Sequence, residues 1–76
     1  PWTNHRLLSA PAADTNAEAF CGGTRPRAIK ILGTGTLSLE DEAGEIIAYP
    51  VTVGDELHCE PYVVKAATDV DIAFWW

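Results

Sequence analysis

Three kinds of metal ligand stand side by side in His58-Cys59-Glu60. An imidazole, a thiolate and a carboxylate could together bind a zinc ion. Successive side chains on a strand point to opposite faces, however, so Cys59 would face away from both neighbours. His58 and Glu60, joined by His5, could still form a surface site, but a structural zinc site needs four closed ligands. We expect an ordinary polar face here, and no metal or other cofactor.

Two carboxylates, Asp69 and Asp71, share one face of an expected strand, and a carboxylate pair is the machinery of a glycosidase. Neighbours on one strand face lie about 7 Å apart and point in parallel, whereas a glycosidase pair flanks a cleft. No motif supports a Ser-His-Asp device. The Gly33-Thr34-Gly35 element precedes no helix, so it fails the context of a dinucleotide site. We therefore expect no enzyme and no catalytic residues.

Cys21 and Cys59 could pair as a disulfide, which would contribute roughly 3 to 4 kcal/mol. Because the sequence shows no secretory signal, we prefer free and mostly buried thiols. The acidic run Glu40-Asp41-Glu42 lacks the spacing of a Ca²⁺ loop. It is typical of a polar hairpin tip.

Length and charge limit the possible partners. A domain of 76 residues buries only about 60% of the surface of its unfolded chain, so we expect oligomerisation to supplement its core. The net charge of −6 would repel a phosphate backbone, which argues against nucleic acid. No apolar run is long enough to span a membrane. We therefore expect association with other copies of the chain, and no nucleic-acid or membrane partner.

The character of the chain changes near residue 27. Residues 1–26 hold three of the five prolines and few large apolar side chains, so we predict an N-terminal arm with a short helix that Asp14 caps. From residue 27 onward, β-branched and aromatic residues alternate with turn signals. We predict strands at 28–32, 36–39, 45–53, 57–65 and 68–76. Gly33-Thr34-Gly35 predicts a bulge or tight turn between the first two, and Pro50 predicts an edge position or a bend in the third. The fold class is all-β, a small antiparallel sandwich or barrel of about five strands, with residues 1–26 as an extended arm and 27–76 as the β domain.

The last strand ends in three aromatic residues. The alternation of strand side chains puts Val70, Ile72, Phe74 and Trp76 on the core face and leaves Trp75 on the opposite face. A strand end that is apolar on both faces needs cover on both. Another subunit is the plainest source of the second cover.

Three stretches of the sequence carry a family resemblance. They are residues 27–39 (Arg-Ala-Ile-Lys-Ile-Leu-Gly-Thr-Gly-Thr-Leu-Ser-Leu), 53–57 (Val-Gly-Asp-Glu-Leu) and 66–75 (Ala-Ala-Thr-Asp-Val-Asp-Ile-Ala-Phe-Trp). In this order the chain resembles the small head spike base proteins of tailed phages and gene transfer agents. In that family an Arg-Ala pair opens a strand, and the chain closes on Asp-Ile-x-Ala and apolar residues. No dependable match precedes residue 27.

The resemblance implies a non-enzymatic virion protein on the outer surface of a capsid. Its implied partners are copies of itself in a pentameric or trimeric ring, the major capsid protein, and a spike or fibre protein. A capsid cement or decoration protein is the alternative. The expected interface residues are Trp2, Leu7 and Leu8 of the arm, together with Trp75 and Trp76. A small carbohydrate-binding module is a further alternative, in which Trp2, Trp75 or Tyr62 would stack on a sugar.

Overall fold

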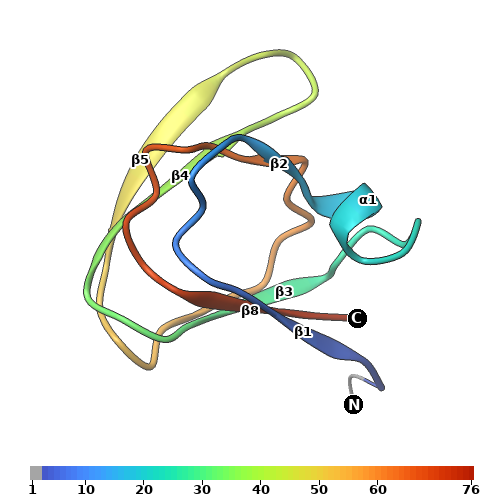
Figure 1. Ribbon diagram of the computed structural model, residues 1–76, viewed down its shortest axis with the longest axis horizontal. Coiled ribbons are helices and arrows are strands. Elements are labelled where there is room, and N and C mark those ends of the chain that lie inside the picture. Colours follow the sequence, from blue (N-terminus) through green and yellow to red (C-terminus); the bar gives the residue numbers. More distant parts are fainter. Residues whose placement is uncertain (1–2) are drawn as a thin grey trace.

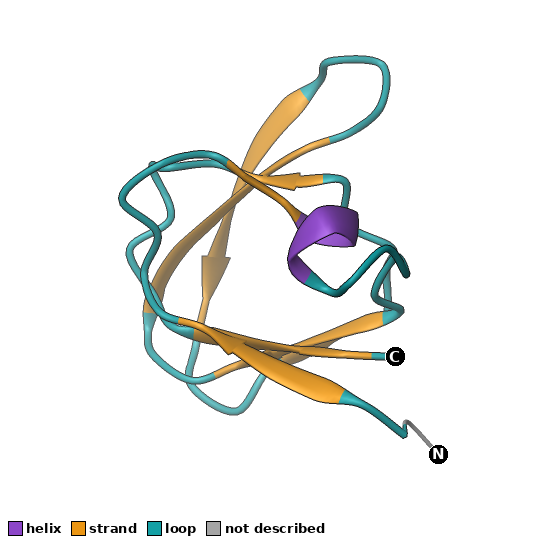
Figure 2. Cartoon of the chain, turned by 45° about the vertical axis from the view of Figure 1, so that its right-hand side comes forward, coloured by secondary structure: helices purple, strands orange, loops and turns teal. Residues whose placement is uncertain are grey.

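Two four-stranded antiparallel sheets form a small sandwich in the computed structural model, which describes residues 3–76 (Figures 1 and 2). Sheet A has the strand order β1-β8-β3-β6, and sheet B has the order β2-β7-β4-β5. The elements are β1 His5–Leu8, β2 Thr15–Asn16, α1 Ala17–Phe20, β3 Ala28–Ile31, β4 Gly35–Glu40, β5 Ile46–Val51, β6 Glu56–Leu57, β7 Val63–Val64 and β8 Ile72–Trp75. The prediction of an all-β fold is confirmed, and of the two predicted architectures the structure has the sandwich.

The two ends of the chain lie side by side in sheet A (Figure 1). The strand β8 is central, between β1 and β3, and Leu8 of β1 lies opposite Ile72. Beyond these strands the backbone N–H of Asn4 donates to the carbonyl of Trp76 at 2.8 Å, and the N–H of Trp76 donates back to Asn4 at 3.0 Å. The C-terminal aromatic segment is thus held in the middle of a sheet.

The segment predicted as an arm is built into the sandwich as far as the structure describes it. The strand β1 joins sheet A, and β2 pairs with β7 in sheet B. Leu8, Ala17 and Cys21 belong to the core. Residues 3–26 therefore do not extend away from the β body. The sequence pattern hid this because only one of the four β1 side chains is buried.

The predicted strand at 57–65 is wrong. The structure has two strands of two residues there, β6 in sheet A and β7 in sheet B, so the chain crosses between the sheets. Pro61 lies in the crossing, and a proline cannot donate a ladder hydrogen bond. Pro50 carries the same signal, and its prediction of an edge position is confirmed because β5 ends sheet B.

Asn16, and not Asp14, caps the short helix α1. The Asn16 side chain accepts a hydrogen bond from the N–H of Ala19 at 3.0 Å. Asp14 instead accepts from the Lys65 ammonium at 2.7 Å and from the N–H of Ala66 at 2.8 Å. Asp14 therefore ties the segment before β2 to the loop after β7.

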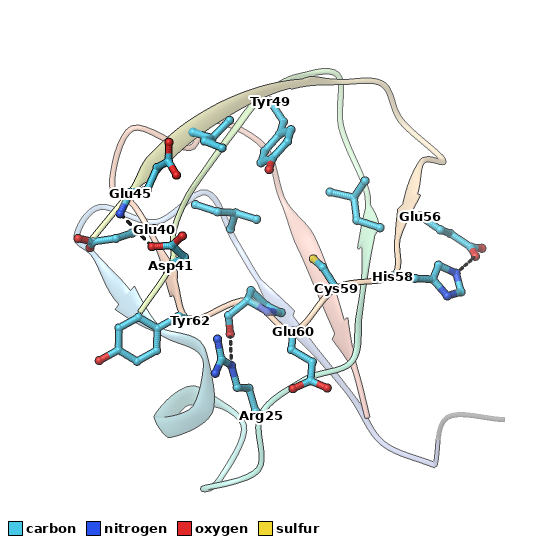
Figure 3. A pocket seen from close by; sticks show the side chains of 14 residues that line it. Arg25, Glu40, Asp41, Glu45, Tyr49, Glu56, His58, Cys59, Glu60 and Tyr62 are labelled. Carbon is cyan, nitrogen blue, oxygen red and sulfur yellow. Dashed lines mark hydrogen bonds and ion pairs between the residues drawn. The ribbon is translucent and has the colours of Figure 1, made fainter. Parts of the chain in front are cut away.

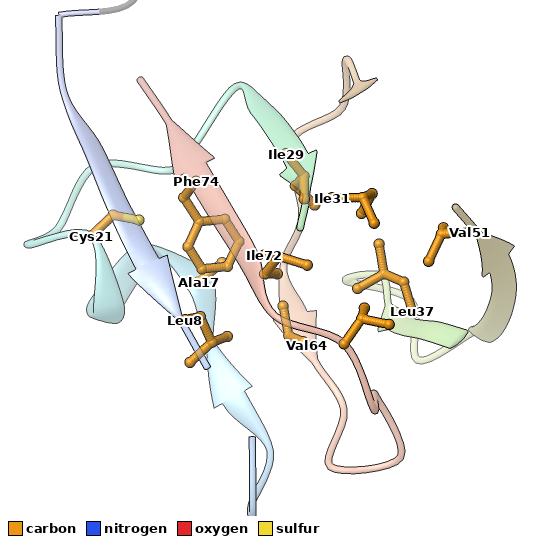
Figure 4. Packing of buried hydrophobic residues seen from close by; sticks show 11 residues of the cluster. Leu8, Ala17, Cys21, Ile29, Ile31, Leu37, Val51, Val64, Ile72 and Phe74 are labelled. Atoms are coloured by element: carbon orange, nitrogen blue, oxygen red, sulfur yellow. The ribbon is translucent and has the colours of Figure 1, made fainter. Parts of the chain in front are cut away.

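The core lies between the sheets and is filled from both (Figure 4). Its fully buried large side chains are Phe74, Ile29, Ile31, Leu37, Ile72 and Val64, along with Pro26. The predicted inner face of the last strand is confirmed, because Val70 is 3% exposed and both Ile72 and Phe74 are fully buried. Phe20 packs edge-on to Phe74, with ring centroids 5.8 Å apart.

Both cysteines are free. Cys21 is buried in the core, whereas Cys59 is half-buried at its margin. Burial raises the pKa of both thiols, because an apolar environment disfavours the thiolate. Both side chains are therefore neutral thiols near pH 7.

Candidate interaction surface

The outer face of sheet A carries the aromatic residue that the alternation of β8 predicted to lie outside the core. Ala73 and Trp75 are half-buried, while their neighbours Ile72 and Phe74 are fully buried. In the register of the sheet, Trp75 lies opposite His5 on one side and Ala28 on the other. Residues opposite one another in a sheet project from the same face. Trp75 thus lies on the outer face of sheet A, at the end of a central strand.

Ala28 shows how this face is covered. None of its surface reaches solvent, yet it does not belong to the core cluster, because its neighbours Ile29 and Ile31 are the residues of β3 that face inward. The Cβ atoms of directly opposed residues are about 4.5 to 5.5 Å apart, which brings Ala28 beside the large indole of Trp75. At this end of the outer face, Trp75 therefore stands between the buried Ala28 and the polar His5.

Leu7 extends the apolar surface onto β1. It lies opposite Ala73 and is 55% exposed. Leu8, which was expected at an interface with it, is only 8% exposed and is part of the core. Alternation along β1 places the two leucines on opposite faces. Leu7 is available to a partner, and Leu8 is not.

The other expected interface residues lie elsewhere. Trp76 is half-buried and packs against the core, so its ring helps to close the sandwich. Trp2 lies outside the described residues. We define the outer patch as Leu7, Ala73 and Trp75, with Ala28 beneath it.

The residues proposed for a sugar platform are divided between two surfaces. Trp75 belongs to the outer patch, whereas Tyr62 lies next to Arg25, whose guanidinium carbon is 5.5 Å from the centre of the tyrosine ring. Tyr62 lines a groove between the two sheets. The two rings do not form one stacking surface.

The candidate acid pair is used to hold loops. The carboxylate of Asp69 accepts a hydrogen bond from the N–H of Thr36, and that of Asp71 accepts one from the N–H of Ala10, both at 2.8 Å. Each carboxylate is therefore committed to the backbone of a neighbouring segment. Sequence spacing could not show this, because each donor is more than thirty residues from its acceptor along the sequence.

The Nε2 atom of His58 lies 3.7 Å from a carboxylate oxygen of Glu56. Lys30 is the main cause of the lowered pKa of Glu56, through a hydrogen bond of 3.2 Å, and His58 contributes less. Within residues 3–76, no three His, Cys, Asp or Glu side chains are arranged to hold a metal ion. The same residues include no helix that is long and apolar enough to cross a membrane.

Sequence reasoning missed a second surface, a solvent-open groove of about 410 Å³ between the hairpin of β4 and β5 and the segment 56–62 (Figure 3). Its apolar residues come from both sheets, and several carboxylates stand around it. The sequence signal was the alternation of Ile47 and Tyr49 along the predicted strand at 45–53.

Comparison with solved structures finds a chain from a particle described as "Capsid of native GTA particle computed with C5 symmetry". It is 30% identical to this chain, with a TM-score of 0.81, and the match covers 100% of this chain and 84% of that one. The chain belongs to the family of phage and gene transfer agent capsid-related proteins. No protein-family model and no curated protein matches the sequence of this capsid-related chain.

Proposed function

We propose that the chain is a non-enzymatic structural subunit on the outer surface of a phage-like capsid, where a homo-oligomeric ring of it forms the base of a head spike. Its likeness to a chain of a gene transfer agent capsid supports the structural role. The outer patch supports the oligomer. That patch, an indole and an exposed leucine on a sheet face over which residues 3–76 place no further strand, is the observation that carries the proposal.

A subunit interface explains why Trp75 lies outside the core. Aromatic residues at the centre of an interface supply much of its binding free energy, and tryptophan is the most enriched of them. A standard interface buries about 800 Å² on each partner, which is about a fifth of the 4305 Å² surface of this chain. A ring uses two different patches per subunit, so the outer patch would meet another part of the next copy.

Five-fold symmetry is the arrangement we favour for the ring. The related capsid was computed with C5 symmetry. The resemblance to head spike base proteins also favours a five-fold position. A cement protein that clamps neighbouring capsid subunits is the alternative role, and its outer patch would then contact the shell.

An image reconstruction of the particle tests the proposal directly. We expect density for this chain as a five-membered ring above each vertex, with Trp75 at the contact between copies. Density scattered between capsid subunits away from the vertices would support the cement role. Particles whose protein composition lacks this chain would contradict both.

A further inference from the structure

The sandwich is open along one side, where the edge strands β5 of sheet B and β6 of sheet A have no strand beyond them among residues 3–76. The groove of about 410 Å³ lies at this opening (Figure 3). Side chains that point inward from both sheets reach it. It is therefore an unfilled part of the layer between the sheets.

The floor of the groove continues the core. The register places Ile47 opposite Leu39 and Tyr49 opposite Leu37, so both β5 residues face the inside of the sandwich. Leu57 of β6 lies opposite the core residue Ile29 and faces inward from the other sheet. Yet Ile47 is 44% exposed and Tyr49 is 40% exposed. These are inward-facing apolar side chains without cover.

The backbone of β5 is open to a further strand. It has six residues and pairs with β4 alone, and every residue from 46 to 50 is exposed. An extended peptide can add to such an edge through main-chain hydrogen bonds, with alternate side chains entering a pocket. Pro50 removes one donor at the end of β5 farther from the hairpin tip. The peptide would pair with the half of the strand nearer that tip.

The charge around the groove identifies the kind of occupant. Five carboxylates line it, Glu40, Asp41, Glu45, Glu56 and Glu60, against one permanent cation, Arg25. Lys65 stands 3.5 Å from Glu40, and Lys30 stands 3.2 Å from Glu56. Glu45 and Glu60 form no ion pair with any described residue. The rim of the groove therefore carries a net negative charge, which neighbouring cations neutralise only in part.

A second copy of the chain fits this charge poorly. The chain has a net charge of −6 and only five Lys and Arg residues. Four of these are engaged within the monomer: Arg6 with the carbonyl of Phe20, Arg25 with Glu42, Lys30 with Glu56, and Lys65 with Asp14. A copy would bring mainly further carboxylates to a negative rim. Electrostatic complementarity instead selects a basic partner.

We propose that the groove binds an extended segment of a different protein, in which apolar residues alternate with Lys or Arg. Its backbone pairs with the free edge of β5. Its apolar side chains cover Ile47, Tyr49 and Leu57. Its cations project from the opposite face of the added strand and lie within the negative field of the rim carboxylates. This docking surface is separate from the outer patch, which lies on the far face of sheet A.

A titration followed by NMR tests this inference on the intact chain. The probe is a short synthetic peptide of alternating valine and lysine, and the control peptide has glutamate in place of lysine. We expect the lysine peptide to shift the amide signals of β5 and of residues 56–62, with binding weakened as salt screens the rim. The glutamate peptide should cause no such shifts. Equal binding of both peptides, shifts confined to other segments, or no binding would overturn the proposal.

Two neighbouring residues of β5 provide a matched pair of variants. Ile47→Lys places a cation in the groove, and we expect it to weaken binding of the lysine peptide by about tenfold or more. Ile46→Lys adds the same charge at the adjacent residue, which is 53% exposed and faces outward, and should change the affinity by less than about threefold. Equal effects of the two variants would overturn a site inside the groove.

The oligomeric state separates this inference from the proposed function. If Ile47→Lys dissociates the oligomer, the groove holds a second copy and the inference is wrong. Loss of oligomers on substitution of Trp75, with peptide binding intact, supports both proposals. An oligomer that survives substitution of Trp75 contradicts the proposed subunit interface. Whether the groove binds a basic peptide is then decided by the peptide titration alone.

Discussion

At the scale of single residues, Trp75 is both the cross-strand neighbour of the buried Ala28 and the proposed contact between copies. Threonine at this position retains a β-favouring side chain and removes the indole. We expect Trp75→Thr to abolish the oligomer in analytical ultracentrifugation. The free energy of unfolding of the monomer should fall by about 1–2 kcal/mol, because the indole is only half-buried.

Val53→Thr is the matched control for this variant. Val53 is 60% exposed and lies in the turn between β5 and β6, away from the outer patch. It should leave the oligomer unchanged. If both variants behave alike, the loss of association reflects surface hydrophobicity in general and not the outer patch.

Asp14 provides a pH-dependent tie between two distant segments. The hydrogen bond from Lys65, followed by that from the Ala66 N–H, holds the pKa of this carboxyl below its usual value. A lowered pKa in the folded state means that the stabilisation is complete above about pH 4 and is lost as the pH falls through the folded pKa. Asp14→Asn should therefore lower the melting temperature at pH 7.

The difference between wild type and Asp14→Asn should shrink in melts recorded at progressively lower pH below about 4. Glu18→Asn serves as a control, because Glu18 is exposed and forms no ion pair with any residue that the structure describes. If the melting temperatures of wild type and Asp14→Asn differ by the same amount from pH 7 to pH 3, the ionised Asp14 carboxylate does not stabilise the fold as proposed.

At the scale of elements, the start of β4 needs a glycine for reasons of space. A Cβ atom added to Gly35 would collide with the carboxylate of Asp69 and lie 2.8 Å from a methyl group of Val70. The same atom at Gly33 would lie 3.8 Å from Val70, which is an ordinary contact. Gly35→Ala should lower the free energy of unfolding by about 1–3 kcal/mol in urea denaturation, because the crowded segment must shift.

Gly33→Ala is the matched control and should change the stability by less than about 1 kcal/mol. Equal losses from the two variants would show that glycine is needed at both positions for its backbone freedom. The predicted bulge or tight turn at Gly33-Thr34-Gly35 thus becomes a close approach between the start of β4 and the loop before β8.

At the scale of the whole molecule, association between copies should add to the stability that the small core provides. A ligand or partner that binds only the folded state stabilises it by mass action, so the melting temperature should rise with protein concentration. Calorimetry over a hundredfold range of concentration measures this. Trp75→Thr should melt at a temperature independent of concentration. A wild-type melting temperature that does not depend on concentration would contradict a homo-oligomer held by reversible contacts.

The local pattern of the sequence determined the faces of β8, the hairpin tip between β4 and β5, and the edge position of β5. Side-chain alternation, a glycine turn and the missing N–H of Pro50 act over a few residues, so the printed sequence shows them directly. The all-β class follows from the same signals repeated along the chain.

Only the tertiary structure decided which strands pair. The strand β1 has a weak pattern of its own, and it becomes a strand because Leu8 completes the core opposite Ile72. The chain between Leu57 and Val63 changes sheets, which no local signal other than Pro61 announced. The outer patch and the groove both depend on such long-range pairing. Leu7 reaches Trp75's face only through the pairing of the two chain ends, and Ile47 lacks cover only because β5 and β6 are edges on the same side of the sandwich.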